Sequence, residues 1–127
     1  MPTITALYAG LLGLLSMVIA FKAGSLRGKK NIPIGDGGDR ELLLAMRRHS
    51  NFIEYVPLAL ILIGVLELNH VKPMVLHALG AALVIARVSH AFGLKPDKLQ
   101  VPARFIGASL TALVVVVASV WAIAVAI

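Results

Sequence analysis

The chain has 127 residues, of which 59% are hydrophobic and only 14% are charged, and its mean hydropathy is +0.92. A soluble domain of this length is usually about half apolar and a quarter charged, so the composition argues against an ordinary water-soluble domain. The chain has no cysteine, which excludes disulfides and thiolate metal ligands. One domain is expected from the length. The formal charge is +6, and the positions of the cations along the chain are more informative than this sum.

The first predicted element is a transmembrane helix over residues 3–26. Residues 5–21 are apolar and uncharged, and with their neighbours they reach the roughly 20 residues that cross about 30 Å of hydrocarbon. The stretch lacks the basic start and the Ala-x-Ala site of a signal peptide. Several glycines and Pro33 then predict that the helix is broken over residues 27–39. Asp39 is predicted to cap the next helix.

The second predicted helix, residues 40–68, carries a polar stripe in its first half. At about 100° per residue, one face of this helix holds four polar residues, namely Arg47, Ser50, Asn51 and Glu54. Polar groups at membrane depth are costly, so they usually face a protein interior or a water-filled cavity. The stripe is therefore predicted to line a site. His49 lies on a different face of the helix and is not expected to contact the ligand.

Two further helices are predicted over residues 74–92 and 102–127. The third helix is mostly apolar but carries Arg87 and His90 towards its end, and Arg104 lies at the start of the fourth. Small residues recur every four positions in both helices, a pattern that lets membrane helices approach closely. The fold class predicted from these elements is an all-α integral membrane four-helix bundle.

Lys and Arg residues concentrate in the first and third connections and their flanks, whereas the turn between the second and third helices holds only Lys72. Because cytoplasmic loops are rich in Lys and Arg, we expect both basic loops in the cytoplasm and both termini away from it. The polar stripe then lies at the same depth as Arg87, His90 and Arg104. Elements far apart in the sequence are thus predicted to place their polar residues in one site.

The arginines of this site predict a cationic pocket for an anionic, peptide-like ligand. Glu54 would accept from an ammonium group, Asn51 would pair with amides, and an arginine would stabilise a thiolate. The alternative is a structural role, in which Arg87 or Arg104 neutralises Glu54 or extends its side chain to lipid phosphates. No metal site is predicted, because the sequence has no HExxH motif and no His pair at i, i+4.

Two motifs carry a resemblance to a known family. The pattern Arg47-x-His49-x-Asn51-x-x-Glu54-x-x-Pro57, followed by Ala86-Arg87-Val88-Ser89-His90, resembles the MAPEG family (membrane-associated proteins in eicosanoid and glutathione metabolism). The likeness extends over the whole chain, and the segment Gly35-Asp36-Gly37-Gly38 before the second helix is similar to short bacterial members. It implies one domain over residues 1–127, a homotrimer, and glutathione bound between adjacent subunits at the cytoplasmic end.

Carried over residue by residue, the resemblance implies that glutathione contacts Arg47, Asn51, Glu54, His90 and Arg104. Arg104 would also be the catalytic residue that stabilises the thiolate. Supporting roles are implied for Arg87, Ser50 and Arg27, the last as a substitute for an arginine that some members place at the end of the first helix. No metal belongs to this set.

The implied function is that of a glutathione-dependent transferase or peroxidase acting on lipophilic electrophiles in the bacterial inner membrane. Its expected partners are glutathione, a lipophilic small molecule and membrane lipid, with no nucleic acid. The chain departs from the eicosanoid-synthesising members at Phe105, Ala108 and Leu94, where they carry a serine and two tyrosines. We therefore do not expect prostaglandin or leukotriene synthesis. The alternative function is a non-catalytic membrane binding or assembly protein that keeps the anion pocket without turnover.

Overall fold

The structure is a computed structural model that describes residues 1–93 and 102–127. These residues form four helices: α1 (Thr3–Lys30), α2 (Arg40–Leu68), α3 (Pro73–Gly93) and α4 (Pro102–Ala126). Each helix is long and apolar enough to cross a membrane. The predicted all-α bundle of four membrane-length helices is confirmed. The basic loop predicted before α4 falls mainly on residues 94–101, outside the described part of the chain.

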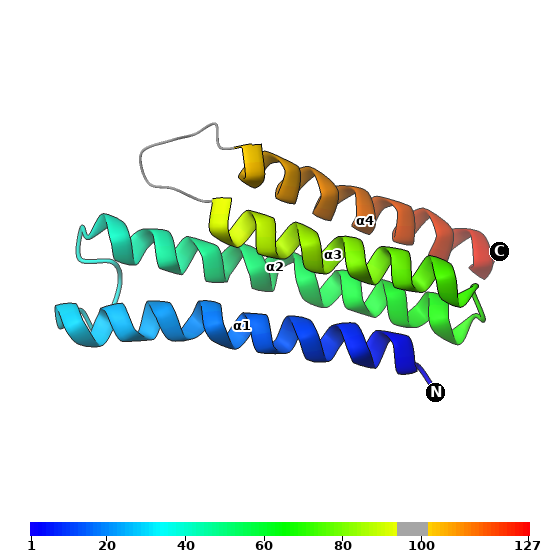
Figure 1. Cartoon of the computed structure of the whole chain (residues 1–127), viewed down its shortest axis with the longest axis horizontal. Coiled ribbons are helices and arrows are strands. Elements are labelled where there is room, and N and C mark those ends of the chain that lie inside the picture. Colours follow the sequence, from blue (N-terminus) through cyan, green and yellow to red (C-terminus); the bar gives the residue numbers. More distant parts are fainter. Residues whose placement is uncertain (94–101) are drawn as a thin grey trace.

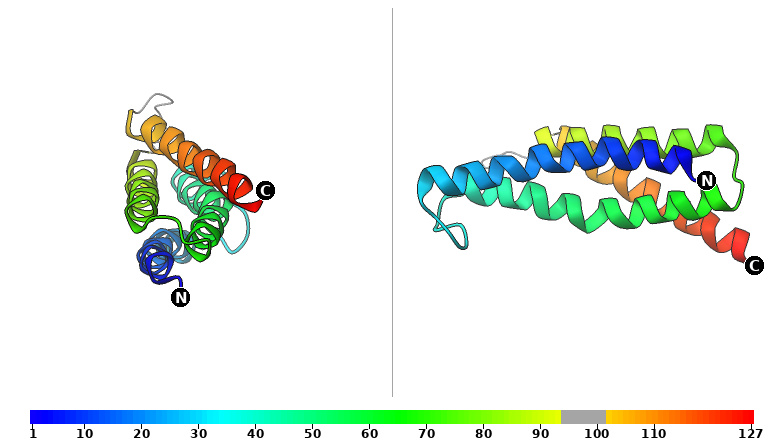
Figure 2. Two further views of the ribbon diagram at one scale, coloured as in Figure 1. Left: turned by 90° about the vertical axis from the view of Figure 1, so that its right-hand side faces the viewer. Right: turned by 90° about the horizontal axis from the view of Figure 1, so that it is seen from below.

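The four helices run side by side, with both termini at one end of the bundle and the α1–α2 connection at the other (Figure 1). Helices α2 and α3 contact each other and both outer helices, whereas α1 and α4 lie on opposite sides and do not touch within the described residues (Figure 2). The C-terminal part of α4 diverges from the other helices (Figure 2). This arrangement leaves α1 and α4 with broad outer surfaces.

The core follows the helical spacing of apolar residues on α2. Phe52, Val56, Ala59, Ile63 and Leu66 lie on one side of that helix, and none is more than 4% exposed. The outer helices behave differently, because large apolar side chains on α1 and α4 remain mostly exposed. Such surfaces suit hydrocarbon rather than water, and a helix pairs its interior backbone groups within itself, as a bilayer requires.

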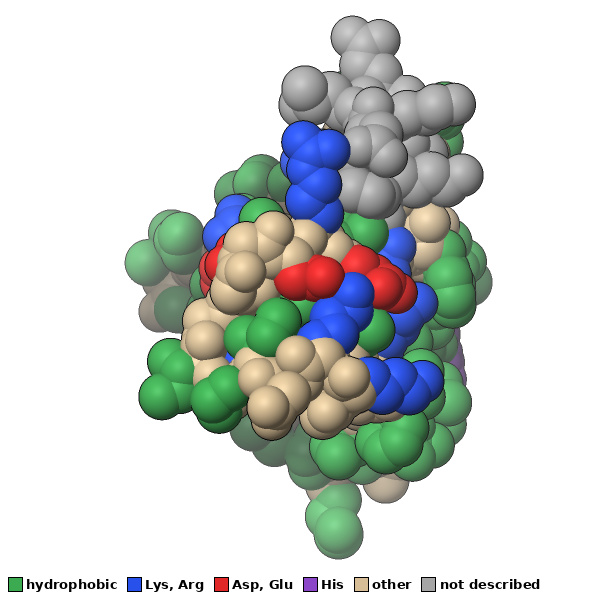
Figure 3. All heavy atoms as spheres, turned by 90° about the vertical axis from the view of Figure 1, so that its left-hand side faces the viewer, with side chains coloured by type: hydrophobic (Ala, Val, Ile, Leu, Met, Phe, Trp, Pro, Cys, Tyr) green, Lys and Arg blue, Asp and Glu red, His purple; other side chains and the backbone are tan. Residues whose placement is uncertain are grey.

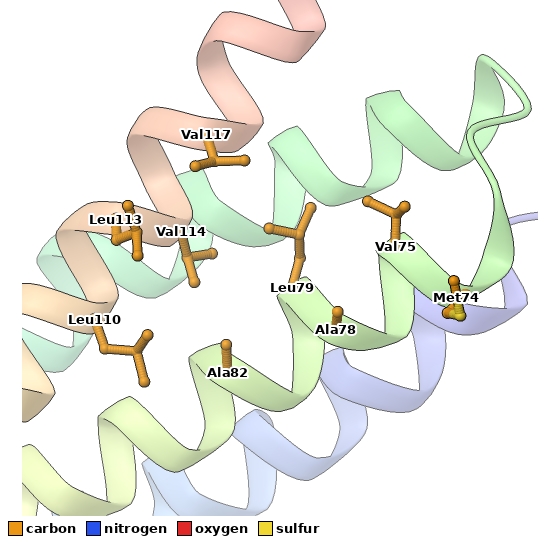
Figure 4. Close-up of a pocket in the computed structure, with 9 residues that line it drawn as sticks. All are labelled: Met74, Val75, Ala78, Leu79, Ala82, Leu110, Leu113, Val114 and Val117. Carbon is orange, nitrogen blue, oxygen red and sulfur yellow. The ribbon is translucent and has the colours of Figure 1, made fainter.

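Small residues let α3 and α4 pack closely over only part of the predicted alanine seam. Ala86 and Ala118 are fully buried. Towards the end of the bundle that holds the termini, the seam opens into an apolar groove of about 300 Å³ (Figure 4). The side chains of Ala78 and Ala82 on α3 line it opposite residues of α4 such as Leu110 and Val117. The groove exists because the alanines do not fill the space between the two helices.

The predicted end of the first helix at residue 26 is wrong, because α1 continues to Lys30. Gly28 is accommodated within the last turn instead of breaking it. The helix ends at Asn31, which adopts a left-handed conformation with φ 52°, and the N–H of Ile32 then donates to the carbonyl of Arg27 at 3.1 Å. This pattern is a common helix terminus, and asparagine tolerates the left-handed region better than most residues.

The start of α2 is capped by Asp39, as predicted. Its Oδ1 accepts from the N–H of Leu42 at 2.8 Å. Lys30, the last residue of α1, lies 2.7 Å from Oδ2 of Asp39 and 3.2 Å from Oε2 of Glu41. The hydrogen bond from Lys30 and then that from Leu42 hold the pKa of Asp39 below its usual range. These contacts lie at the basic end of the bundle, where Lys and Arg side chains surround a few acids (Figure 3).

The N-terminus of α1 is capped from another helix. Its own N-cap residue, Pro2, offers no side-chain hydrogen bond. Instead, Oε1 of Glu67 accepts from the N–H of Ile4 at 2.8 Å, and Oε2 accepts from the N–H (2.7 Å) and the hydroxyl (2.6 Å) of Thr5. A carboxylate satisfies free N–H groups and complements the positive end of the helix dipole. Glu67 therefore ties the beginning of α1 to the end of α2.

We predict that Glu67→Ala lowers the free energy of unfolding by about 1–3 kcal/mol, because it leaves the N–H groups of Ile4 and Thr5 without acceptors. Glu67→Gln keeps one oxygen and should lose less. Thermal unfolding in detergent measures both changes. Glu41→Ala removes an acid from the opposite end of α2 that contacts Lys30 at the surface but caps no N–H of α1, and it serves as the control. An equal effect of the two alanine variants would contradict the assigned capping role.

Candidate functional site

A buried arginine on α3 forms the centre of the polar cluster. Arg87 is 1% exposed. Its Nη2 donates to Oδ1 of Asn51 on α2 at 2.8 Å, and its Nη1 lies 3.5 Å from Oγ1 of Thr111 on α4. Its guanidinium also lies over the ring of Phe52, 5.5 Å from the centroid, a distance at which a cation is attracted to an aromatic face. Arg87 thus joins three helices through one charged group.

The close approach of α4 to this arginine depends on Gly107. A Cβ at this position would lie 2.6 Å from the carbonyl oxygen of Ala86 and 2.6 Å from the N–H nitrogen of His90, so any larger residue would force the helices apart. One turn further along α4, the hydroxyl of Thr111 donates to the carbonyl of Gly107 at 2.7 Å. The same hydroxyl oxygen is thereby positioned to accept from Arg87.

Arg87 also sets the hydrogen-bonding character of its neighbours. The guanidinium can only donate, so Oδ1 of Asn51 must accept and the side-chain NH₂ of Asn51 remains available as a donor. His90 is 5% exposed, and its Nδ1 lies 3.5 Å from Nη2 of Arg87. If Nδ1 accepts from Arg87, the neutral ring carries its proton on Nε2. The contact from Arg87 to Asn51 is shorter than the contact to His90 and is therefore the stronger hydrogen bond.

No carboxylate in the described part of the chain pairs with Arg87. The ion pairs found there join Lys30 to Asp39 and to Glu41. The structure therefore does not support the alternative in which Arg87 or Arg104 neutralises Glu54. The Nε atom of Arg87 also has no hydrogen-bond partner within the protein. A buried cation that is only partly satisfied can take a further acceptor.

A cavity of about 80 Å³ adjoins this cation. Its lining comes from α2, α3 and α4 and consists of Asn51, Tyr55, Arg87, Ala108, Thr111 and Ala112. Ala108 stands where the eicosanoid-synthesising members carry a tyrosine, and its small side chain leaves part of this space open. The cavity exceeds the roughly 30 Å³ that one water occupies in the liquid, so it has room for a small polar group beside Arg87.

The remaining predicted residues, Arg47, Ser50, Glu54 and Arg104, do not line the cavity beside Arg87. Arg47 and Glu54 are exposed on the outside of the protomer, and Ser50 is partly buried between them. Arg104 is partly buried in the first turn of α4, and its charge, like that of Arg87, acts on His90. A ligand that meets all of these residues must bind on the outer face of the protomer.

Arg27, which the resemblance places among the supporting residues, lies apart from the cluster. Arg27 donates through Nη1 to the carbonyls of Ile32 and Pro33, both at 3.3 Å, and of Gly35 at 2.9 Å. Within this protomer it therefore orders the α1–α2 connection, and the structure does not join it to Asn51 or Arg87. Leu94, the other departure from the family pattern, lies outside the described residues.

Reasoning from sequence missed two contributors to the site. Thr111 lies seven residues after Arg104, a spacing that places both on one face of a helix, so its position was readable. Tyr55 directly follows Glu54 in the polar motif of α2, but it is not part of the four-residue polar stripe and received no role. Both side chains line the cavity beside Arg87.

The sequence profile of the MAPEG family matches residues 5–124, nearly the whole chain. The chain belongs to the MAPEG family. It is also 38% identical over 90 residues to inner membrane protein YecN of Escherichia coli K12, an alignment that covers 71% of this chain and 69% of YecN. YecN of Escherichia coli O6:H1 (strain CFT073) matches with the same values. No solved structure matches this chain significantly. Membership in MAPEG confirms the family predicted from the two motifs, and the four long apolar helices make this member a multi-pass membrane protein.

We predict that Thr111→Val lowers the free energy of unfolding by about 1–2 kcal/mol, because it removes the hydroxyl that bonds Gly107 and faces Arg87 while keeping the side-chain volume. Thermal or denaturant unfolding in detergent measures this change. Ser109→Ala removes an exposed hydroxyl from the same helix and should have almost no effect. Equal stability of Thr111→Val and the native protein would mean that the hydroxyl does not support Arg87.

Proposed function

We propose that this MAPEG protein binds glutathione at the α2–α3–α4 cluster and uses it as a cosubstrate in transferase or peroxidase chemistry on lipophilic electrophiles. The observation that carries the proposal is the contact between Arg87 and Asn51, which leaves the NH₂ group of Asn51 as a donor. With the N–H of His90, this group is suited to bind the carboxylates of an anionic ligand. The broad association of the family with glutathione supports this choice of ligand.

Glutathione carries two carboxylates, one ammonium group and a thiol, and the residues of the cluster match these groups in kind. Arg47 and Arg104 supply cations for the carboxylates, and a guanidinium can form two parallel bonds to such a group. Glu54 supplies the acceptor for the ammonium. Asn51 and His90 supply neutral donors between these charges. This set fits a zwitterionic peptide better than it fits a simple anion.

The proposed site is completed by an adjacent subunit in a homotrimer. Arg47 and Glu54 are exposed on the protomer, so their ligand-facing sides are open to a neighbour. The outer surfaces of α1 and α4 also leave many apolar side chains available for contact with other copies. A peptide bound between two protomers would be withdrawn from water on both sides, which strengthens its ionic contacts.

In the proposed reaction the glutathione thiol releases its proton to water, and Arg104 stabilises the thiolate that remains. The residue lies in the first turn of α4, where free N–H groups and the helix dipole also favour negative charge. The thiolate sulfur attacks an electrophilic carbon to form a carbon–sulfur bond. The displaced group leaves with the electron pair, or the adjacent atom takes up a proton after addition. A lipophilic substrate reaches the sulfur laterally from the bilayer.

We place the protein in the bacterial inner membrane with both termini away from the cytoplasm. The two termini lie at the end of the bundle opposite the basic α1–α2 connection (Figure 1). Basic connections remain in the cytoplasm during insertion, which supports this orientation. The similarity to an inner membrane protein of Escherichia coli supports the compartment.

A second candidate function is non-catalytic binding, in which the pocket holds its ligand without turnover. The observation that favours it is the apolar character of α4 beside Arg104. Phe105 is 74% exposed where the eicosanoid-synthesising members carry a serine, and Ala108 faces the cavity where they carry a tyrosine. Hydroxyl groups that would assist the thiol are therefore missing at these two positions.

We predict that Asn51→Asp weakens glutathione binding tenfold or more, a loss of about 1.4 kcal/mol or greater. The aspartate keeps an acceptor for Arg87, so the bundle remains folded, but it replaces the donor with a negative charge that repels carboxylates. Isothermal titration of the purified protein in detergent measures the affinity. Asn69→Asp adds the same charge at the far end of α2 and should bind like the native protein. Failure of the folded native protein to bind glutathione would overturn the proposed function.

We predict that glutathione bound to the native protein at neutral pH shows the ultraviolet band of a thiolate, and that Arg104→Ala removes this band by raising the thiol pKa. Difference absorbance during a glutathione titration measures it. His49→Ala alters a residue that is not expected to contact the ligand and should retain the band. Binding without any thiolate band in the native protein would favour the non-catalytic alternative.

A further inference from the structure

A second site lies between α1, α2 and α3, near the end of the bundle that carries the α1–α2 connection. It is a groove of about 210 Å³ whose apolar walls include Leu15, Val18 and Ile19 of α1 and Phe92 of α3. Its polar lining consists of two cations, Lys22 from α1 and Arg48 from α2, and no acid lines it. None of these residues belongs to the proposed glutathione site.

The two cations lie at one depth in the membrane. Counted at 1.5 Å per residue, the helix from Thr3 to Lys22 and the helix from Arg48 to Leu68 each span about 30 Å. This length equals the thickness of the hydrocarbon layer. If the far ends of α1 and α2 lie at one boundary of this layer, Lys22 and Arg48 lie at the other. Lipid phosphates occupy that level.

The apolar walls lie below the cations, in the direction of the bilayer centre. Leu15, Val18 and Ile19 precede Lys22 by three to seven residues, so they continue along the helix for about 10 Å towards the hydrocarbon. Val18 is 65% exposed and Phe92 is 72% exposed, so the edges of the groove are open to a lipid tail. The groove therefore combines a cationic mouth with an apolar channel.

We propose that this groove binds one anionic glycerophospholipid, with its phosphate between Lys22 and Arg48 and one acyl chain along α1. A guanidinium and an ammonium together suit a phosphate oxyanion. An acyl chain meets equally apolar surroundings in the groove and in the rest of the bilayer. Its contacts with α1 therefore position the lipid but do not favour one headgroup over another. The preference for an anionic headgroup comes from the two cations, at roughly fivefold for each one near the membrane surface.

Native mass spectrometry of the delipidated protein tests the proposal. The protein is titrated with phosphatidylglycerol or with phosphatidylcholine of the same acyl chains. We expect one tightly retained phosphatidylglycerol per chain, at least tenfold preferred over phosphatidylcholine. Lys22→Gln/Arg48→Gln should abolish this preference. The control Lys29→Gln/Lys72→Gln removes two exposed cations elsewhere and should keep it. Inorganic phosphate in large excess should not displace the lipid, because it has no tail for the groove.

Three results would overturn the proposal. One is equal retention of phosphatidylglycerol by the native protein and by Lys22→Gln/Arg48→Gln. Another is dissociation of the oligomer in that variant with unchanged lipid preference, which would assign the groove to a contact between subunits. The third is loss of preference in Lys22→Arg/Arg48→Lys, which keeps both charges. The charge-conserving pair also provides a test if the glutamine pair fails to fold.

Discussion

The cost of keeping a guanidinium inside an apolar bundle governs the polar half of this molecule. Burial strips Arg87 of water, so the surrounding helices must replace the lost hydrogen bonds. They do so with an amide from α2, a hydroxyl from α4 and an aromatic face, without a carboxylate from the described residues. Removing any one of these helices would leave the ion less solvated. The arginine therefore makes the mutual arrangement of α2, α3 and α4 specific, whereas apolar packing alone tolerates sliding.

The same constraint connects packing with recognition. Asn51 uses its side-chain oxygen to accept from Arg87 within the bundle. Its side-chain NH₂ group is therefore left to donate to a ligand. Gly107 contributes indirectly to this hydrogen-bond network, because it lets α4 come near enough to α3 for Thr111 to reach the guanidinium of Arg87. A glycine and a threonine with no charge thus influence which ligand groups the site can accept. In this fold the residues that stabilise the interior also prepare the binding surface.

Much of the fold could be predicted from local sequence, because membrane helices are recognised by the length and the apolar composition of a segment. Asp39 was recognised as a cap because its partner lies three residues away. The end of α1 was misjudged, since Gly28 signals a break locally while the following residues continue to bond. The site was only partly readable: the stripe with Asn51 followed from helical periodicity, but its bond to Arg87 joins residues 36 apart and depends on how the helices pack. The capping of α1 by Glu67 was missed for the same reason.

The link between Glu67 and the start of α1 has a consequence for biosynthesis. The first helix is made and reaches the membrane long before the chain has been extended to Glu67, which lies 62 residues after Thr5. Until then the N–H groups of Ile4 and Thr5 must remain hydrated, because Pro2 offers no side-chain cap and their acceptor is Glu67. Docking of the α1–α2 hairpin supplies the missing carboxylate and allows that end to leave water. The hairpin, rather than the single helix, is therefore the smallest unit in which the N–H groups of Ile4 and Thr5 find their acceptor within the protein.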